Sequence, residues 1–239
     1  MVTLSSPEVC ELFAALGYDW LFIDAEHTPM EAKDLQALLQ AAHPTPGIIR
    51  LGTDNPAAIA KALDIGADGI IVAMVNTAEQ TRNIVKAAKY APAGQRGRGL
   101  ARAHRYGVKL AEYSATANDA VAVIVQAEHA DAVRNIREIV RVEGLDSVLI
   151  GPYDLASSLG HTGNVDHPDV RAAIKTIRAA CVEVGLPTGI LGVDAAALEP
   201  HIQDGFTLLI AGLDVLMLGD AAKEMLAAVR KQDVRSFHP

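Results

Sequence analysis

Two apolar runs decide the fold of this chain: Val121-Ala122-Val123-Ile124-Val125-Gln126-Ala127 and Ser147-Val148-Leu149-Ile150. The residues between them, 130–141, carry apolar side chains at helical spacing and predict an amphipathic helix. A strand, a helix and a second strand form a parallel pair joined by a right-handed crossover. Both strands then point the same way, so the carboxylates that follow them, Glu128 and Asp154, are expected to meet on one face.

The same alternation of strand and helix runs through almost the whole chain. Further strands are predicted at 20–23, 47–51, 69–72, 187–191 and 207–211, and further helices at 31–42, 55–65, 77–89, 167–183, 195–204 and 214–230. Regular alternation over 239 residues predicts one (β/α)8 barrel domain covering residues 1–239, with a doubly wound open sheet as the alternative. Val2-Thr3-Leu4 is the candidate first strand, and it is either very short or truncated.

Composition and charge argue against several classes of protein. The formal net charge of −8 argues against general nucleic-acid binding, because phosphate backbones attract basic surfaces. No apolar run reaches the length of a membrane span and no signal peptide is evident, so no membrane association is expected. Cys10 and Cys181 fall on predicted helices far apart in sequence, and we expect buried, reduced thiols of a cytoplasmic protein.

In a barrel the active site lies at the C-terminal ends of the strands, and the residues expected there are mostly ionisable. Asp24 and His27 follow one strand, and a carboxylate that orients a histidine suits general-base catalysis near neutral pH. Glu26 is a candidate supporting residue between them. Arg50 ends the next strand, where anion or oxyanion recognition is favoured over a surface ion pair.

Glu128 and Asp154 can each be explained as helix caps, but two converging carboxylates repel unless a cation or a proton separates them. The preferred interpretation is a hard divalent cation held by both, with coordination positions left for substrate. Strand alternation places Gln126 on the same side as Glu128, as a substrate contact. The turn Gly151-Pro152-Tyr153 offers backbone N–H groups that can hold a substrate carboxylate.

The segment 90–119 interrupts the alternation, because it is too long for an ordinary loop. Its basic side chains are Arg96, Arg98, Arg102, His104, Arg105 and Lys109. Two interpretations stay open: a basic flap over an anionic substrate, and a solvated or subunit-interface segment. The second is favoured.

Five segments, in order along the chain, resemble the HpcH/HpaI aldolase/citrate lyase family, in particular its metal-dependent class II pyruvate aldolases. They are 19–27, 49–51, 90–97, 125–128 and 150–155. The first reads Asp19-Trp20-Leu21-Phe22-Ile23-Asp24-Ala25-Glu26-His27 and is the most distinctive. The chain departs from the family pattern at Ala25, where glycine is usual, and at Tyr153, where a small residue is usual.

The resemblance implies a carbon–carbon lyase that reversibly cleaves 4-hydroxy-2-oxo acids to pyruvate and an aldehyde. It implies Mg²⁺, Mn²⁺ or Co²⁺ held by Glu128 and Asp154, Arg50 at the keto oxygen, and Asp24 with His27 in proton transfer. Cleavage leaves a pyruvate enolate, whose charge the cation and Arg50 stabilise. The resemblance also implies a swapped C-terminal helix and a hexamer built as a trimer of dimers.

Three other functions stay open at this point. One is an enzyme like citrate lyase or malyl-CoA lyase, and another is an oxaloacetate decarboxylase, since both pass through the same enolate chemistry. The third is a non-catalytic module that binds a keto acid or a metal. A Schiff-base aldolase is disfavoured, because no lysine ends a predicted strand on the active face.

Overall fold

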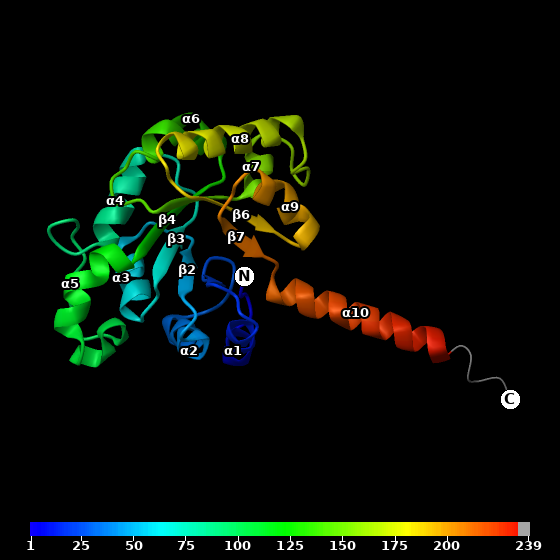
Figure 1. The fold of residues 1–239 in the computed structure, drawn as a ribbon, viewed down its shortest axis with the longest axis horizontal. Coiled ribbons are helices and arrows are strands. Elements are labelled where there is room, and N and C mark those ends of the chain that lie inside the picture. The colour runs from blue at the N-terminus through cyan, green and yellow to red at the C-terminus, as the bar shows by residue number, and fades with distance from the viewer. Residues whose placement is uncertain (234–239) are drawn as a thin grey trace.

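Seven parallel strands, each paired with its neighbours in sequence, curve into a barrel in the computed structural model, which describes residues 1–233 (Figure 1). The strands are β1 (Leu21–Asp24), β2 (Gly47–Leu51), β3 (Gly69–Val72), β4 (Ala122–Ala127), β5 (Ser147–Ile150), β6 (Thr188–Gly192) and β7 (Leu208–Ala211). Three of them have the predicted bounds, and the other four differ from prediction by one residue. The predicted parallel order is therefore confirmed.

The N-terminal segment occupies the gap between β1 and β7. Val2 forms a parallel bridge with Ile23. The Val2 N–H donates to the Phe22 carbonyl at 2.7 Å, and the Asp24 N–H donates to the Val2 carbonyl at 3.0 Å. The fold is thus a (β/α)8-type barrel whose first strand is reduced to one bridge, as the short Val2-Thr3-Leu4 stretch predicts.

Asp214, which follows β7, binds the same N-terminal segment by hydrogen bonds. Its buried carboxylate accepts the backbone N–H groups of Thr3 and Leu4, each at 2.9 Å, and the hydroxyl of Thr3 at 2.6 Å. The Asp214 N–H also donates to the Met1 carbonyl at 3.1 Å. We call these contacts, together with the Val2–Ile23 bridge, the closing seam of the barrel.

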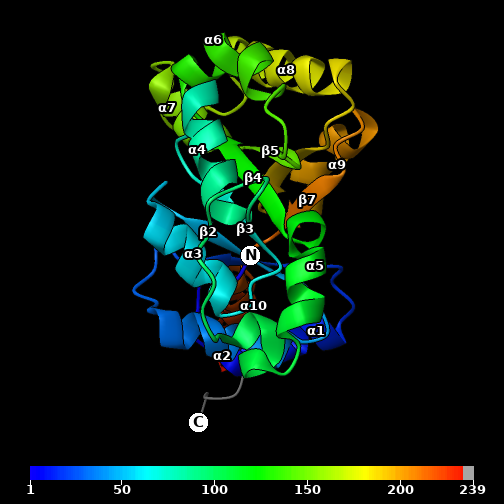
Figure 2. The same cartoon turned by 90° about the vertical axis from the view of Figure 1, so that its left-hand side faces the viewer.

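Helices surround the strands (Figures 1 and 2). They are α1 (Pro7–Ala15), α2 (Ala32–Ala42), α3 (Pro56–Asp64), α4 (Ala78–Ala88), the 3-10 helix η1 (Arg102–Gly107), α5 (Leu110–Ala120), α6 (Ala130–Ile139), α7 (Pro152–Ser158), α8 (Pro168–Glu183), α9 (Ala195–Gln203) and α10 (Asp214–Asp233). The sequence pattern does not predict η1, α5 or α7. The 7-residue α7 is too short to show a helical period, although Pro152 at its first turn is a usual start signal.

Apolar side chains form two separate cores. The larger core lies between the strands and the helices, and the buried thiols of Cys10 and Cys181 belong to it, as predicted. The smaller core fills the barrel interior with one residue from each of six strands: Phe22, Ile48, Ile71, Ile124, Leu149 and Ile210. Side chains two residues apart on a strand face the same way. Asp24, Arg50 and Gln126 lie two residues beyond such interior residues, and all three are buried.

The basic segment between α4 and β4 packs around the N-terminal end of the barrel. Arg102 donates to the carbonyls of Ile65 and Gly66, just before β3, at 3.0 and 3.3 Å. Within residues 1–233, no residue of 90–119 lines the hollow at the opposite end. The interpretation of this segment as a flap over substrate is therefore wrong within one chain. Its arginine instead satisfies carbonyls at a helix C-terminus, where positive charge is favoured.

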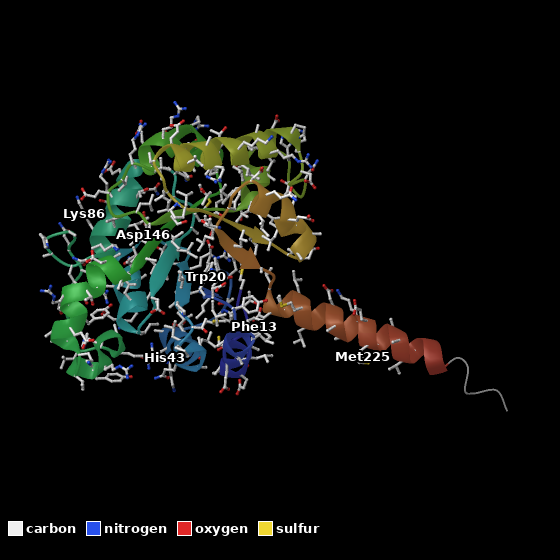
Figure 3. The ribbon with its side chains drawn as sticks, viewed as in Figure 1. Phe13, Trp20, His43, Lys86, Asp146 and Met225 are labelled. Atoms are coloured by element: carbon white, nitrogen blue, oxygen red, sulfur yellow. The ribbon has the colours of Figure 1, made fainter. Side chains whose placement is uncertain are left out.

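Helix α10 projects away from the barrel (Figure 1), and Figure 3 shows Met225 well clear of the barrel body. Its exposed apolar side chains are Val215, Leu216, Met217, Leu218, Met225, Leu226 and Val229. Within residues 1–233 no helix combines the length and apolarity needed to cross a membrane.

Candidate active site

A small hollow with a volume of about 60 Å³ opens at the C-terminal ends of the strands. Its floor contains Phe22, Leu149 and Ile210 from the interior core. Its walls include six residues that the sequence predicts at the site: Arg50, Gln126, Gly151, Pro152, Tyr153 and Asp154. Strands β2, β4 and β5 and the first turn of α7 therefore bring the predicted substrate contacts and one predicted metal ligand to a single cavity.

Arg50, which lines this hollow, forms an ion-pair cluster with two carboxylates that lie behind it. Nη2 of Arg50 lies 2.8 Å from one carboxylate oxygen of Asp24, and Nε donates to the other at 2.9 Å. Nε also lies 3.2 Å from Oε2 of Glu26. The guanidinium sits over the Phe22 ring, 5.1 Å from its centroid. This bidentate, stacked arrangement fixes the plane of the guanidinium before any ligand arrives.

His27 lies beyond the end of β1 and does not line the hollow, and 66% of its side chain is exposed. The expected contact between its ring and the Asp24 carboxylate does not form in the described structure, because Arg50 takes both oxygens of Asp24. Asp24 instead accepts the backbone N–H of His27 at 3.5 Å. The carboxylate beside the imidazole is Glu26, with Oε2 at 3.5 Å from Nε2. Glu26 thus contacts both His27 and Arg50.

The negative charge of Glu128 has no cationic partner of this kind, because the groups that donate hydrogen bonds to it are neutral. Oε1 accepts the backbone N–H of Met74 at 2.8 Å, and Oε2 accepts a hydrogen bond from Nε2 of Gln126. Burial raises the pKa of the Glu128 carboxyl, the two hydrogen bonds lower it, and the nearby charges of Asp154 and Glu26 raise it further. The net direction is upward. This carboxylate therefore carries a buried negative charge that its protein neighbours do not neutralise.

Met74 donates its hydrogen bond from an unusual backbone conformation. Its φ is +55°, in the left-handed region that residues other than glycine rarely adopt. The side chain is exposed, so the contribution to the site comes from the backbone N–H alone. The sequence places Met74 at a strand end on the active face, but it does not predict the contact with Glu128, because a backbone donor leaves no signal in residue type.

Gly151 allows the loop before α7 to approach Glu128. A Cβ atom at this position would lie 2.5 Å from Oε2 and 2.9 Å from Cβ of Glu128, so a side chain would displace the carboxylate. Asp154 follows in the first turn of α7, where a helix N-terminus favours negative charge. Asp154 is exposed to the hollow, and its charge acts on Glu128.

These donors fit a hard divalent cation. Glu128 and Asp154 offer carboxylate oxygens, the ligands that Mg²⁺ and Mn²⁺ prefer. Among the described residues, Oε1 of Gln126 is buried without a hydrogen-bond partner, which places another oxygen donor beside Glu128. A cation here would neutralise the buried charge of Glu128 and leave coordination positions for a ligand in the hollow.

The chain is similar to one protein family over most of its length. Residues 1–221 match the profile of the family described as HpcH/HpaI aldolase/citrate lyase. A hydroxypyruvate/pyruvate aldolase of Cupriavidus necator is 37% identical over 235 residues, which cover 97% of this chain and 87% of that protein. A 4-hydroxy-2-oxo-heptane-1,7-dioate aldolase of Shigella sonnei is 39% identical over 228 residues, which cover 94% of this chain and 87% of that protein.

Solved structures agree with the sequence comparison. The crystal structure of an HpcH/HpaI aldolase/citrate lyase family protein from Burkholderia cenocepacia J2315 matches with a TM-score of 0.91. The sequence identity is 36%, and the match covers 96% of this chain and 92% of that one.

Proposed function

Because this chain belongs to the HpcH/HpaI aldolase/citrate lyase family and is a carbon–carbon lyase, we propose that it reversibly cleaves 4-hydroxy-2-oxo acids to pyruvate and an aldehyde. Pyruvate stands in the name of the Cupriavidus necator relative, and a 4-hydroxy-2-oxo acid in that of the Shigella sonnei relative. The observation that carries the proposal is one hollow lined by a fixed arginine, Arg50, and by Gln126, which contacts the buried carboxylate of Glu128; this carboxylate has no cationic partner among the described residues.

Cleavage of the bond between C3 and C4 moves negative charge onto the keto oxygen of the pyruvate fragment. A divalent cation, proposed as Mg²⁺, Mn²⁺ or Co²⁺ and held by Glu128 and Asp154, would supply Lewis acidity at this oxygen. Arg50 directs a second positive charge at it. No reorientation is needed, because Asp24 and Glu26 already hold the guanidinium.

His27 is the proposed acceptor of the proton from the C4 hydroxyl. Its imidazole is exposed beyond the end of β1, and Glu26 is close enough to stabilise the imidazolium that forms. Asp24 is proposed to act through its hold on Arg50 and on the backbone of His27. We assign no direct proton transfer to Asp24, because both its oxygens are engaged.

The carboxylate of the substrate is proposed to bind at the start of α7. Tyr153 offers a backbone N–H group there, in the first turn of the helix that Pro152 opens, whereas the Gly151 N–H donates to the Ala127 carbonyl at 3.4 Å. Gln126 lines the same wall. The Tyr153 ring occupies part of the hollow, so we expect it to limit the size of the aldehyde.

The first test is deuterium exchange into the methyl group of pyruvate, followed by proton NMR. It needs no knowledge of the aldehyde. Protein stripped with a chelator is tested alone and with Mg²⁺, Mn²⁺ or Co²⁺. We expect exchange that depends on the metal and is lost in Glu128→Ala.

Two other outcomes would contradict the proposal in different ways. Pyruvate binding without exchange under any metal would remove the enolate chemistry from this site. Neither binding nor exchange would mean that the pyruvate assignment itself is wrong.

We also propose that α10 docks on a second copy of the chain, in a hexamer built from dimers. Support comes from the apolar side chains that α10 exposes away from its own barrel, including Leu218 and Met225. Multi-angle light scattering should report the hexamer. Leu218→Glu with Met225→Glu should reduce the mass, and an unchanged mass would argue against docking through α10.

A further inference from the structure

Three potential metal ligands meet where the loop after α7 enters α8: His161 lies in the loop, His167 is the N-cap of α8 and Asp169 is in its first turn. His161, His167 and Asp169 each place one ligand atom within 4.8 Å of the others, and this is the one such group of three within residues 1–233. Their side chains are 25%, 31% and 65% exposed, so ions in solution can reach them. The group does not belong to the catalytic hollow, whose lining contains none of the three.

We propose that these residues form a second cation site, selective for a transition metal such as Zn²⁺. Nε2 of His161 lies 2.9 Å from Oδ2 of Asp169, and Nδ1 of His167 lies 3.6 Å from the same oxygen. The imidazole rings stack with centroids 3.4 Å apart. Tetrahedral Zn²⁺ with bonds of about 2.0–2.1 Å separates its ligand atoms by about 3.3–3.4 Å. The two separations from the Asp169 oxygen bracket this value, and a bond from Nδ1 of His167 to the ion would replace the hydrogen bond that this nitrogen accepts from the Asp169 N–H.

The ligand chemistry favours a different metal from that of the catalytic hollow. Two imidazoles and one carboxylate suit Zn²⁺ and similar borderline ions, whereas the oxygen donors around Glu128 suit Mg²⁺ or Mn²⁺. Binding replaces the proton between His161 and Asp169 with the ion. Because the rings are only 16° from parallel, they must turn so that their nitrogens converge, and their partial exposure leaves room for that.

The loop backbone fixes His161 at the end of α7 before any ion binds. The His161 N–H donates to the Ala156 carbonyl at 2.8 Å, and the His161 carbonyl accepts from Asn164 at 2.9 Å. Gly160 reverses the chain with a φ of +82°. Because these contacts already order the loop backbone, less conformational entropy is lost when a metal brings the three ligands together.

Helix capping alone does not account for the group. His167 caps α8 by accepting the Asp169 N–H at Nδ1, at 3.2 Å, but this needs no second histidine. Serine, threonine, aspartate and asparagine are the usual capping residues. An ion here would tie the end of α7, whose first turn carries Asp154, to the start of α8.

Equilibrium dialysis of chelator-stripped protein against Zn²⁺ tests the site. Four variants separate it from the catalytic hollow: His161→Ala, His167→Asn, Glu128→Gln, and Glu128→Gln combined with His161→Ala. Asparagine at 167 keeps an acceptor for the helix cap and removes the imidazole. His43→Ala, an exposed histidine elsewhere, is the matched control.

We expect two Zn²⁺ per chain in the wild type and in His43→Ala, one in each of the other single variants, and none in the double variant. Zn²⁺ should also raise the melting temperature of Glu128→Gln but not that of the double variant. Equal Zn²⁺ content in His161→Ala, His167→Asn and the wild type would overturn the proposal, as would millimolar affinity. Loss of one Zn²⁺ in His161→Ala and His167→Asn, with no loss in Glu128→Gln, would contradict only the catalytic metal assignment.

Discussion

Arg50 and Glu128 lie at the same end of the barrel, but the protein balances their charges in different ways. Arg50 has two carboxylate partners, Asp24 and Glu26, and needs no ligand to stay in place. Glu128 has only neutral donors, and its neighbour Asp154 adds a second negative charge. The strand period places both residues at the site. Only the neighbouring elements decide which charge is neutralised within the chain and which is left for a ligand.

The largest effect is expected from Glu128→Gln, which removes the carboxylate charge that no cationic residue neutralises. Without this carboxylate the proposed cation loses a ligand, so pyruvate exchange should fall by about 10³-fold or more. Metal content measured by mass spectrometry should fall in parallel. Exchange within tenfold of the wild type would show that Glu128 is not a metal ligand.

Arg50→Lys tests the arginine whose charge Asp24 and Glu26 neutralise. Lysine keeps a positive charge but cannot make the bidentate contact with Asp24, so exchange should fall by about 10²-fold. Binding of Mn²⁺ should change little, because Arg50 is not among the proposed ligands. A loss of Mn²⁺ equal to that in Glu128→Gln would mean that metal binding at Glu128 depends on Arg50.

Asp24→Asn should cost stability as well as activity. It leaves a buried guanidinium with Glu26 as its one remaining carboxylate, and we expect a loss of about 2–3 kcal/mol in urea denaturation. Glu26→Gln is the control and should cost less, because Glu26 makes a single, longer contact with Arg50. A larger cost for Glu26→Gln would reverse the assignment of the main partner.

The smallest effect is a gain in stability, expected for Glu128→Gln without metal. Burial raises the pKa of Glu128 in the folded state. Ionising this carboxyl therefore lowers the free energy of unfolding, and this destabilisation is absent below about pH 4.5 and complete above the raised pKa. Metal-free wild type should therefore lose stability as pH rises through this window, and the variant should be more stable by about 1 kcal/mol at neutral pH.

Melting curves in chelator across this pH range measure the difference between the two proteins. The amide can be accommodated, because Gln126 can turn its unpartnered oxygen towards the new donor. A difference that does not change with pH would contradict the raised pKa.

Residues on strands were the easiest part of the site to predict. Apolar residues at period two fix which side chains face the interior, and Arg50 and Gln126 follow in phase. Contacts beyond the strand ends could not be predicted in the same way. The period places Asp24 beside Arg50 on neighbouring strands, but it does not show which acid the arginine binds. Beyond the end of β1 the period no longer holds, so sequence did not reveal that Glu26 faces His27.

Two other features escaped prediction for local reasons. Met74 acts through a backbone N–H in a left-handed conformation, which its residue type does not indicate. Helix α5 covers residues 110–120, and Ala117 is its one buried residue, so it has no stripe of apolar side chains at helical spacing. The contacts of Arg102 with carbonyls near β3 depend on where that segment packs, which is a long-range property.

The closing seam has a consequence for the order of folding. Neighbouring strands from β1 to β7 pair successively along the chain, but Thr3 and Asp214 are 211 residues apart. Closing so long a loop costs more entropy than pairing adjacent strands, so the ring should close last. The seam also rests on few hydrogen bonds, so it should open before the rest of the barrel under native conditions, exchanging the amide of Val2 sooner than that of Ile49.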